Sequence, residues 1–254
     1  MLNALREPPR ARATLGHVLR GIPVTVADGL RLGGRDALVR RLLLSAGAAG
    51  SALAAIELLT PGRAAALTGA SESGAVLVAA IACAGFICSG VGSHLAPLTP
   101  RLAGGGERAV MVSLGISASG LLLLGATAAA TGTIPLVLAA TGYGLVYLGF
   151  GAAGPSENEL LHRRVTRAGR TTALSVQSLA LQLVAALTGL IVGVLPPGPL
   201  PWLLGGTALL AGALLWIHRS EPTPTSPPPS PQPHTVSPSP TTVGSDLHHS
   251  DTDQ

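Results

Sequence analysis

Five polar side chains stand inside long apolar stretches of this sequence, where they could bind a solute or carry a proton. They are two amides, two phenols and one carboxylate: Gln177, Gln182, Tyr143, Tyr147 and Glu57. An amide or a carboxylate in hydrocarbon is costly unless it is paired or wet, so such groups often mark a substrate path. The competing interpretation is structural, because the same groups also form hydrogen bonds between packed helices.

Helical spacing groups several of these side chains by face. Ser175, Ser178 and Gln182 recur at intervals of three and four residues, and Tyr143 and Tyr147 are four residues apart. Residues at these intervals share one face of a helix. For Gln182 and Tyr143 we keep both interpretations open, as substrate-path residues and as packing contacts. For the second amide and the second phenol the structural interpretation is favoured.

Glu57 is the one carboxylate inside a predicted span. An acid inside a membrane segment suggests a proton carrier or a substrate-path residue. Glu57 lies four residues before Pro61, near the expected end of its run. We therefore favour an interfacial carboxylate that faces water, with Arg63 as its candidate partner.

Apolar helices are the elements that must position these groups. Residues 109–156 and 171–217 form runs of 48 and 47 residues without a charged residue or a histidine. A membrane-spanning helix needs about 20 residues, so each run predicts two spans. Proline and glycine, at 131–135 and 196–201, mark the turns between them. With two earlier runs, the sequence predicts an all-α, polytopic bundle of six transmembrane helices at 39–59, 74–95, 109–130, 133–153, 172–195 and 200–217.

The arginines predict the orientation of this bundle. The chain has 16 arginines and no lysine, with eight arginines before the first span and then one, two, none, four, none and one in the following segments. Basic segments stay in the cytoplasm, so both termini are predicted to be cytoplasmic in a multi-pass protein of the inner (cytoplasmic) membrane. A soluble helical protein is disfavoured, because 11% charged and 2% aromatic residues do not suit a soluble domain of this size.

The chain divides into three parts. Residues 1–37 alternate arginines with aliphatic residues and predict a basic amphipathic segment on the cytoplasmic membrane surface, a disordered basic tail being the alternative. Residues 38–219 form the bundle. Residues 220–254 are rich in proline, serine and threonine and predict a disordered cytoplasmic tail.

Small residues predict where the helices pack. The second span has a small residue at every fourth position, which predicts a smooth contact face: Ala80, Ala84, Cys88 and Gly92. Cys83 is five residues from Cys88 on a different face, so we expect no disulfide between them.

The sequence does not predict an enzyme. Ser117 lies in a small-residue stretch of the third span, but no histidine occurs in the last two spans to activate it. A phosphate-binding loop of the Gly-x-x-x-x-Gly-Lys kind is impossible without lysine. No basic patch is interleaved with aromatic residues, so we expect no nucleic-acid partner, and we expect no cofactor and no metal.

Three segments resemble the second half of a major facilitator superfamily transporter. The basic stretch at 11–41 is similar to the family's central linker. The segment at 92–108 is similar to its Gly-x-x-x-Asp-Arg-x-Gly-Arg loop, with the glycines and arginine present and the aspartate missing. The segments at 159–165 and 170–178 are similar to the loop and entry into the eleventh helix of bacterial export-type members.

This resemblance implies a secondary carrier that exports small molecules by rocking around a central cavity. It also implies a cytoplasmic gate, made by the residues at matching positions: Arg101, Arg108, Glu157, Glu159, Arg163 and Arg164. The family has twelve spans, so six spans imply a missing N-terminal half or a homodimer mate, and the linker-like start favours a fragment. The alternative is a six-span scaffold or an oligomeric channel without transport activity of its own.

Overall fold

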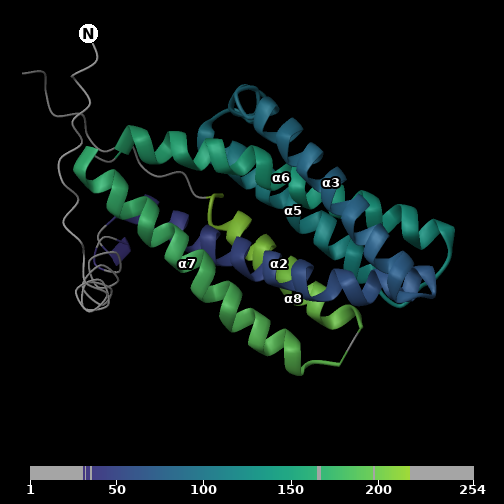
Figure 1. The fold of residues 1–254 in the computed structure, drawn as a ribbon. Helices are drawn as coiled ribbons and strands as arrows, with labels where there is room; N and C mark the ends of the chain where they lie inside the picture. The colour runs from purple at the N-terminus through teal and green to yellow at the C-terminus, as the bar shows by residue number, and fades with distance from the viewer. Residues whose placement is uncertain (1–30, 32, 35, 165–166, 197, 218–254) are drawn as a thin grey trace, which may run out of the picture. The chain divides into compact units, whose positions relative to one another are not determined.

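Helices make up the regular structure of this chain (Figure 1). The structure is a computed structural model that describes residues 31–217 except 32, 35, 165–166 and 197, and these residues contain no strand. The all-α prediction is therefore confirmed. The predicted surface segment at 1–37 falls mainly outside the described residues, and the predicted tail at 220–254 falls entirely outside them. The helices are α2 (Ala37–Thr68), α3 (Ser71–Leu95), α4 (Thr99–Ala103), α5 (Gly106–Thr127), α6 (Thr133–Arg164), α7 (Arg167–Val194) and α8 (Pro199–Leu214).

Five of these helices, α2, α3, α5, α6 and α7, are long and apolar enough to cross a membrane. The chain is thus a helical bundle of the multi-pass membrane type. The sixth predicted span corresponds to α8, which is apolar but has 16 residues. At 1.5 Å per residue α8 is about 24 Å long, short of a hydrocarbon core of about 30 Å. Its role as a sixth span stays a prediction.

The predicted turns are confirmed where proline and glycine cluster. A break separates α5 from α6 at residues 128–132, where Gly132 has a φ of 109°, and α8 begins at Pro199 after the proline-rich turn. Single prolines behave differently. Helix α2 continues through Pro61 to Thr68, and α6 continues through Pro155 to Arg164. One proline removes one backbone donor, and packed membrane helices tolerate that loss.

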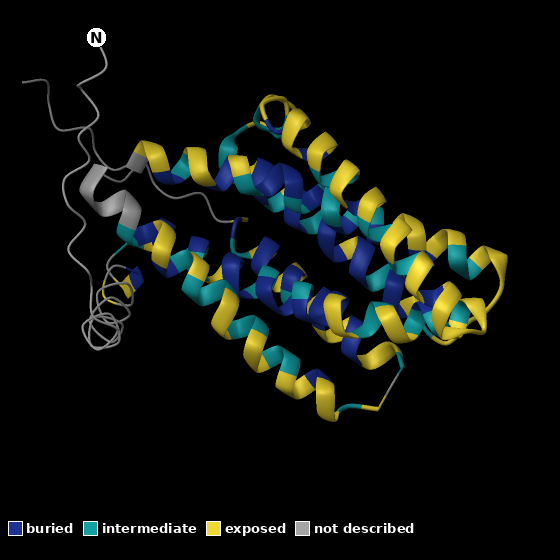
Figure 2. Cartoon of the chain, viewed as in Figure 1, coloured by how far each residue is buried: buried dark blue, intermediate teal, exposed yellow. Residues whose placement is uncertain are grey.

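Helices α2, α5, α6, α3 and α8 pack in a ring. The extensive contacts join α2 to α8, α8 to α5, α5 to α6, α6 to α3 and α3 to α2, while α7 packs on α2. Few residues of α3 and α7 are buried, whereas about half of the residues of α5 are (Figure 2). Apolar side chains on the outside of a bundle suit a hydrocarbon environment, where lipid takes the place of water.

Glycines at the crossing points allow the backbones to touch. A Cβ at Gly50 of α2 would lie 2.1 Å from the carbonyl oxygen of Leu181 in α7, and one at Gly151 of α6 would lie 2.1 Å from that of Ser89 in α3. Such contacts admit no larger residue.

The predicted contact face of the second span is found in part, because Cys88 and Gly92 lie at the contact with α6. Gly92 is buried at the contact with α6, but Ala80 and Ala84 are exposed. Gly85, one residue along the helix from Ala84, makes the contact instead, where it packs against the ring of Tyr143. A four-residue repeat of small side chains fits several faces of one helix, so it did not select the packed face.

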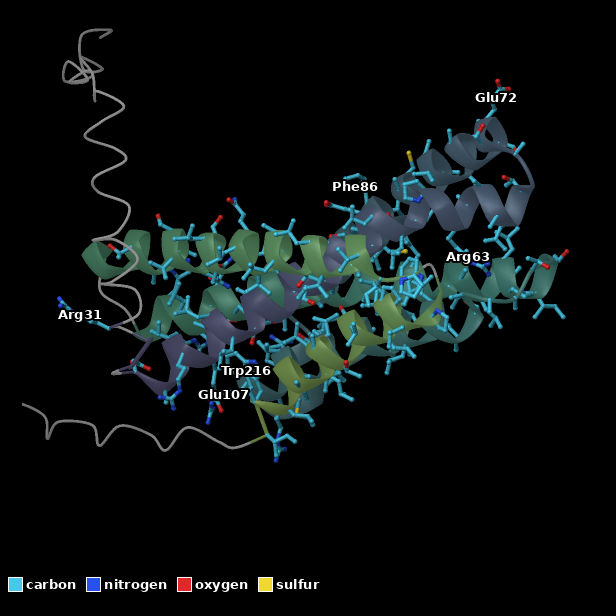
Figure 3. The ribbon with its side chains drawn as sticks, turned by 90° about the horizontal axis from the view of Figure 1, so that it is seen from below. Arg31, Arg63, Glu72, Phe86, Glu107 and Trp216 are labelled. Atoms are coloured by element: carbon cyan, nitrogen blue, oxygen red, sulfur yellow. The ribbon has the colours of Figure 1, made fainter. Side chains whose placement is uncertain are left out.

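The two ends of the bundle carry different polar groups (Figure 3). Glu107 and Trp216 lie toward one end, and Arg63 and Glu72 lie toward the other. The segment with the single arginine is therefore at the end opposite to the start of α5. This arrangement agrees with the predicted alternation of loops, and the compartment at each end stays a prediction.

Candidate functional site

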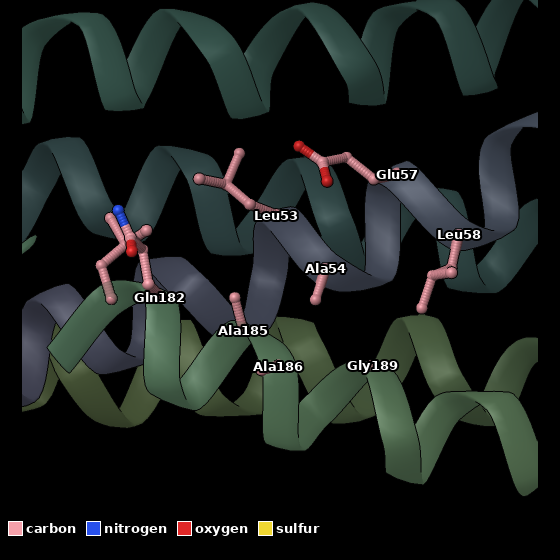
Figure 4. Close-up of a pocket in the computed structure, with 9 residues that line it drawn as sticks. Leu53, Ala54, Glu57, Leu58, Gln182, Ala185, Ala186 and Gly189 are labelled. Carbon is pink, nitrogen blue, oxygen red and sulfur yellow. The ribbon is translucent and has the colours of Figure 1, made fainter. Parts of the chain in front are cut away.

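An open groove between α2 and α7 contains two of the predicted substrate-path residues (Figure 4). The groove has a volume of about 470 Å³. Glu57 of α2 and Gln182 of α7 are its polar members, and their side chains project on the same side of the helix pair. The other lining residues are aliphatic or small: Leu53, Ala54, Leu58, Leu181, Ala185, Ala186 and Gly189.

Glu57 lies inside a helix and not at its end. Helix α2 continues for eleven residues beyond it, and Glu57 is exposed. Arg41, near the other end of α2, is 16 residues away, or about 24 Å along the axis. If Arg41 marks the boundary of the hydrocarbon core, Glu57 is still within its thickness of about 30 Å.

Arg63, the candidate partner of Glu57, binds elsewhere. Its guanidinium donates to the carbonyl oxygen of Thr127 at 2.6 Å and to that of Ala130. These carbonyls lie at the C-terminal end of α5, where a helix has free acceptors and a partial negative charge. Arg63 therefore caps α5, and among the described residues the ion pairs are Arg41–Glu107 and Arg163–Glu159.

Gln182 is exposed in the groove. Its Nε2 donates to the Oγ of Ser178 at 3.4 Å, on the same helix and at the long limit of a hydrogen bond. That contact confirms the predicted shared face of Ser178 and Gln182. Because it stays within α7, it does not tie α7 to a neighbouring helix. The amide faces the groove and is available to a solute.

Tyr143 and Tyr147 form a stacked pair on α6. Their ring centroids are 4.8 Å apart with planes at 30°, and the Tyr143 hydroxyl donates to the Tyr147 hydroxyl at 3.4 Å. The rings pack over Gly85 of α3, where a Cβ would come within 2.7 Å of Tyr143 Cε1. The pair is thus a packing contact between α3 and α6, and neither phenol lines the groove.

Gln177 does not join this group. Its Nε2 donates to Oε2 of Glu157 at 2.9 Å, which links α7 to α6. Gln177 and Gln182 are five residues apart, which places them on different faces of α7. This bond between helices agrees with the structural interpretation that was favoured for Gln177, whose amide satisfies a buried carboxylate.

The predicted gate residues occupy one end of the bundle but do not form a cross-loop network in the described part of the chain. Arg101 and Arg108 are exposed, and Arg163 pairs with Glu159 of its own helix at 2.5 Å. Both partners of that pair are more than half exposed, so it contributes little. The side chain of Arg164 lies outside the described residues.

Two cross-helix ties were missed by the sequence reasoning. Arg41 of α2 pairs with Glu107 of α5 at 3.8 Å, and the indole Nε1 of Trp216 donates to the Oγ of Ser45 at 2.8 Å. Trp216 and Ser45 are buried and 171 residues apart, so no local pattern joins them. An acid in the first turn of a helix, as Glu107 is, was the available signal for the first tie.

The described residues contain no group of three histidine, cysteine, aspartate or glutamate side chains arranged to hold a metal ion. Cys83 and Cys88 are free thiols on α3. The polar chemistry available at the groove is thus that of one carboxylate and one amide.

Fold and groove together define a class: a multi-pass helical membrane bundle with a polar groove on one face. No family model, no curated protein and no solved structure matches the chain. The major facilitator resemblance therefore remains a prediction from the residues that carry it.

Proposed function

We propose that this chain is one half of a secondary carrier that exports small molecules across the cytoplasmic membrane. The observation that carries the proposal is that Glu57 and Gln182 line the same open groove, whose other lining residues are apolar. Charged and amide groups at such depth serve substrate or ion paths more often than packing. The groove is open along one side, as expected of a half-site that a second set of helices completes.

The packing order of the helices supports this proposal. The six long or apolar helices in the described part of the chain form two consecutive sets of three, α2, α3, α5 and α6, α7, α8. When each helix of the first set is exchanged with its counterpart in the second, the α2–α7 contact becomes the α6–α3 contact, and the α5–α6 contact becomes the α8–α2 contact. The α5–α8 contact maps onto itself. Two three-helix repeats arranged in this way occur within each six-helix half of major facilitator carriers. The α2–α3 contact is the exception, because α6 and α7 do not pack as extensively in the described residues.

The residues that we assign to the substrate path are Glu57, Gln182, Tyr143 and Tyr147. Glu57 supplies a negative charge, Gln182 supplies an amide donor and acceptor, and the phenols would supply hydroxyls from α6. Arg41, Glu107, Glu157 and Gln177 connect helices at one end of the bundle and would belong to its cytoplasmic gate. The proposed partner is a further six-helix half or a second copy of the chain.

The competing function is an oligomeric channel or a scaffold. A symmetric oligomer could build a ring of like residues from Glu57 alone, which is the feature that favours a channel over an inert scaffold. A channel passes ions in proportion to driving force, whereas a carrier saturates and shows counterflow. Flux in proteoliposomes therefore separates the two.

Ligand binding is the direct experiment for the groove. A library of small molecules is screened for compounds that raise the unfolding temperature of the purified full-length chain. A ligand at 100 times its Kd stabilises the folded state by about 2.7 kcal/mol, which such a screen detects. We expect the stabilisation to be lost in Gln182→Ala and Glu57→Gln and retained in Thr207→Ala.

Thr207 is a matched control because it is an exposed polar residue of α8 whose hydroxyl bonds to its own helix. Equal stabilisation of all three variants by every hit would remove the groove from the proposed site. Saturable counterflow of a hit, with the chain alone or co-expressed with a partner half, is the expected second result. Ohmic ion flux without counterflow would establish the channel alternative.

The proposed orientation has its own test. With both termini cytoplasmic, a C-terminal tag on intact cells is reached by protease only after permeabilisation. Digestion of that tag from the outside would contradict the proposed orientation and the gate assignment with it.

A further inference from the structure

A second groove lies between α7 and α8. Both helices pack on α2 but diverge from one another, and the space between them has a volume of about 670 Å³. Its lining is apolar except for Ser51. Gly47 and Ala48 of α2 form part of its floor, and the exposed side chain of Leu183 and the small side chain of Ala211 stand on its two walls.

Arg40 continues the floor of this groove at one end. Helix α2 contributes four lining residues near this end: Leu43, Leu44, Gly47 and Ala48. Arg40 precedes them by three, four, seven and eight residues. Residues at these intervals share one helix face, so Arg40 stands at the mouth of the groove. Arg40 is exposed. The next residue, Arg41, points to α5 and pairs with Glu107, so the two arginines serve different faces.

The groove therefore has the layout of an amphiphile, with a positive charge at one end and apolar walls beyond it. From Arg40 to Ser51 is eleven residues, or about 16 Å along the axis. That length is close to half of a hydrocarbon core of about 30 Å, which is the depth of one leaflet. A partner helix would place its own apolar surface against Arg40, whereas a phospholipid places an anionic headgroup there.

We propose that the α7–α8 groove binds an acyl chain of an anionic phospholipid from the leaflet at the Arg40 end, with Arg40 holding the headgroup. The guanidinium donates paired hydrogen bonds to phosphate oxygens, and the acyl chain fills the space between α7 and α8. The bound lipid takes the place of a direct contact between these two helices. This inference depends on the membrane location of the chain and not on its transport activity.

Native mass spectrometry of the purified full-length chain tests the proposal. The protein is exchanged into detergent containing equal amounts of phosphatidylglycerol and phosphatidylcholine with identical acyl chains. We expect one retained phospholipid, with phosphatidylglycerol preferred roughly fivefold, as one arginine near an anionic surface provides. In Arg40→Gln this preference should fall to that of a non-specific adduct, while Arg101→Gln, which changes an exposed arginine of α4, should retain it.

A second variant separates the groove from the charge. Ala211→Phe fills the groove from an exposed position of α8 and should abolish the retained lipid of either headgroup. Ala80→Phe adds the same ring to an exposed position of α3 and should leave it in place. Lipid retention by Ala211→Phe equal to that of the wild type would overturn the proposal. So would a headgroup preference that survives Arg40→Gln, or a lipid-free dimer of the chain that Ala211→Phe converts to monomer.

Discussion

Two grooves run along opposite faces of α7, and their polarity differs. The groove between α2 and α7 holds Glu57 and Gln182, while the groove between α7 and α8 is apolar apart from Ser51. Helix α2 contributes to both, as a wall of the first groove and as the floor of the second, whose other wall is α8. Among the described residues, no polar residue of α7 lines the apolar groove, whereas Gln182 of the same helix faces the groove that holds Glu57. A solute path on one side of α7 and lipid on the other would account for this difference.

The contact between α2 and α7 is the element that both grooves share, so its loss should have the largest effect. Gly50→Ala places a Cβ where the carbonyl oxygen of Leu181 stands, 2.1 Å away. We expect a loss of about 3 kcal/mol in the free energy of unfolding, because an overpacked contact forces backbones apart. Thermal unfolding in detergent measures this loss. We also expect that neither lipid nor ligand stabilises this variant any longer.

Gly62→Ala is the matched control. Gly62 is in the same helix, and a Cβ there meets nothing within 4 Å. Alanine is the better helix former, so this variant should be neutral or slightly more stable. If Gly50→Ala is as stable as Gly62→Ala, the close approach of α2 and α7 is not the frame of the two grooves.

Moving the amide from one groove to the other sharpens the comparison. In the double variant Gln182→Leu with Leu183→Gln, the composition of α7 is unchanged but the amide turns by about 100° around the helix axis. We expect transport or ligand binding to fall at least tenfold, with no recovery from the relocated amide, and the amount of protein in the membrane to stay the same. Recovery of activity would mean that polarity of α7, and not its placement, is what matters.

The far wall of the apolar groove depends on the tie between Trp216 and Ser45. Trp216→Phe removes the indole donor and leaves the Ser45 hydroxyl bonded to the carbonyl oxygen of Arg41. We expect a loss of about 1 kcal/mol in the free energy of unfolding, the value of one net hydrogen bond. In a double-mutant cycle with Ser45→Ala, the two losses should not add. Additive losses would show that the two side chains act independently.

The smallest effect is expected at the exposed ion pair of α6. Glu159→Gln should change the free energy of unfolding by no more than about 0.5 kcal/mol, because both side chains of the Arg163–Glu159 pair are mostly exposed. Glu107→Gln should cost more, since the Arg41–Glu107 pair is less than one quarter exposed and joins two helices. Chemical denaturation of the two variants under one condition ranks them, and the reverse order would contradict the proposed gate contacts.

Local signals predicted much of the fold. The lengths of the apolar runs predicted the long helices. The clusters of proline and glycine at 131–135 and 196–201 predicted the turns, because several helix-breaking residues in a row end a helix whatever it packs against. Pro61 misled because one proline within a packed helix is overridden by its neighbours, as Pro155 within α6 also shows. Glu57 was placed at a helix end for the same reason.

The candidate site was predicted in part, and its missing parts depend on contacts between distant residues. Gln182 and Glu57 do line one groove, but their adjacency requires the α2–α7 crossing, which no spacing within α7 reveals. A structural role was favoured for Gln177, but its partner, Glu157, is on another helix and no spacing within α7 reveals it. The role of Arg63 as a cap of α5 likewise depends on a turn that lies 64 residues away.

Water access to the two faces of α7 tests the central claim most directly. Single cysteines replace Gln182 or Leu183 in a background of Cys83→Ala and Cys88→Ala, and cells or membranes are treated with a membrane-impermeant maleimide. The account predicts that the cysteine at position 182 is labelled and that the cysteine at position 183, one residue along the helix, is not. Equal labelling of the two positions, or labelling of position 183 alone, would contradict the assignment of a solute path to one groove and lipid to the other.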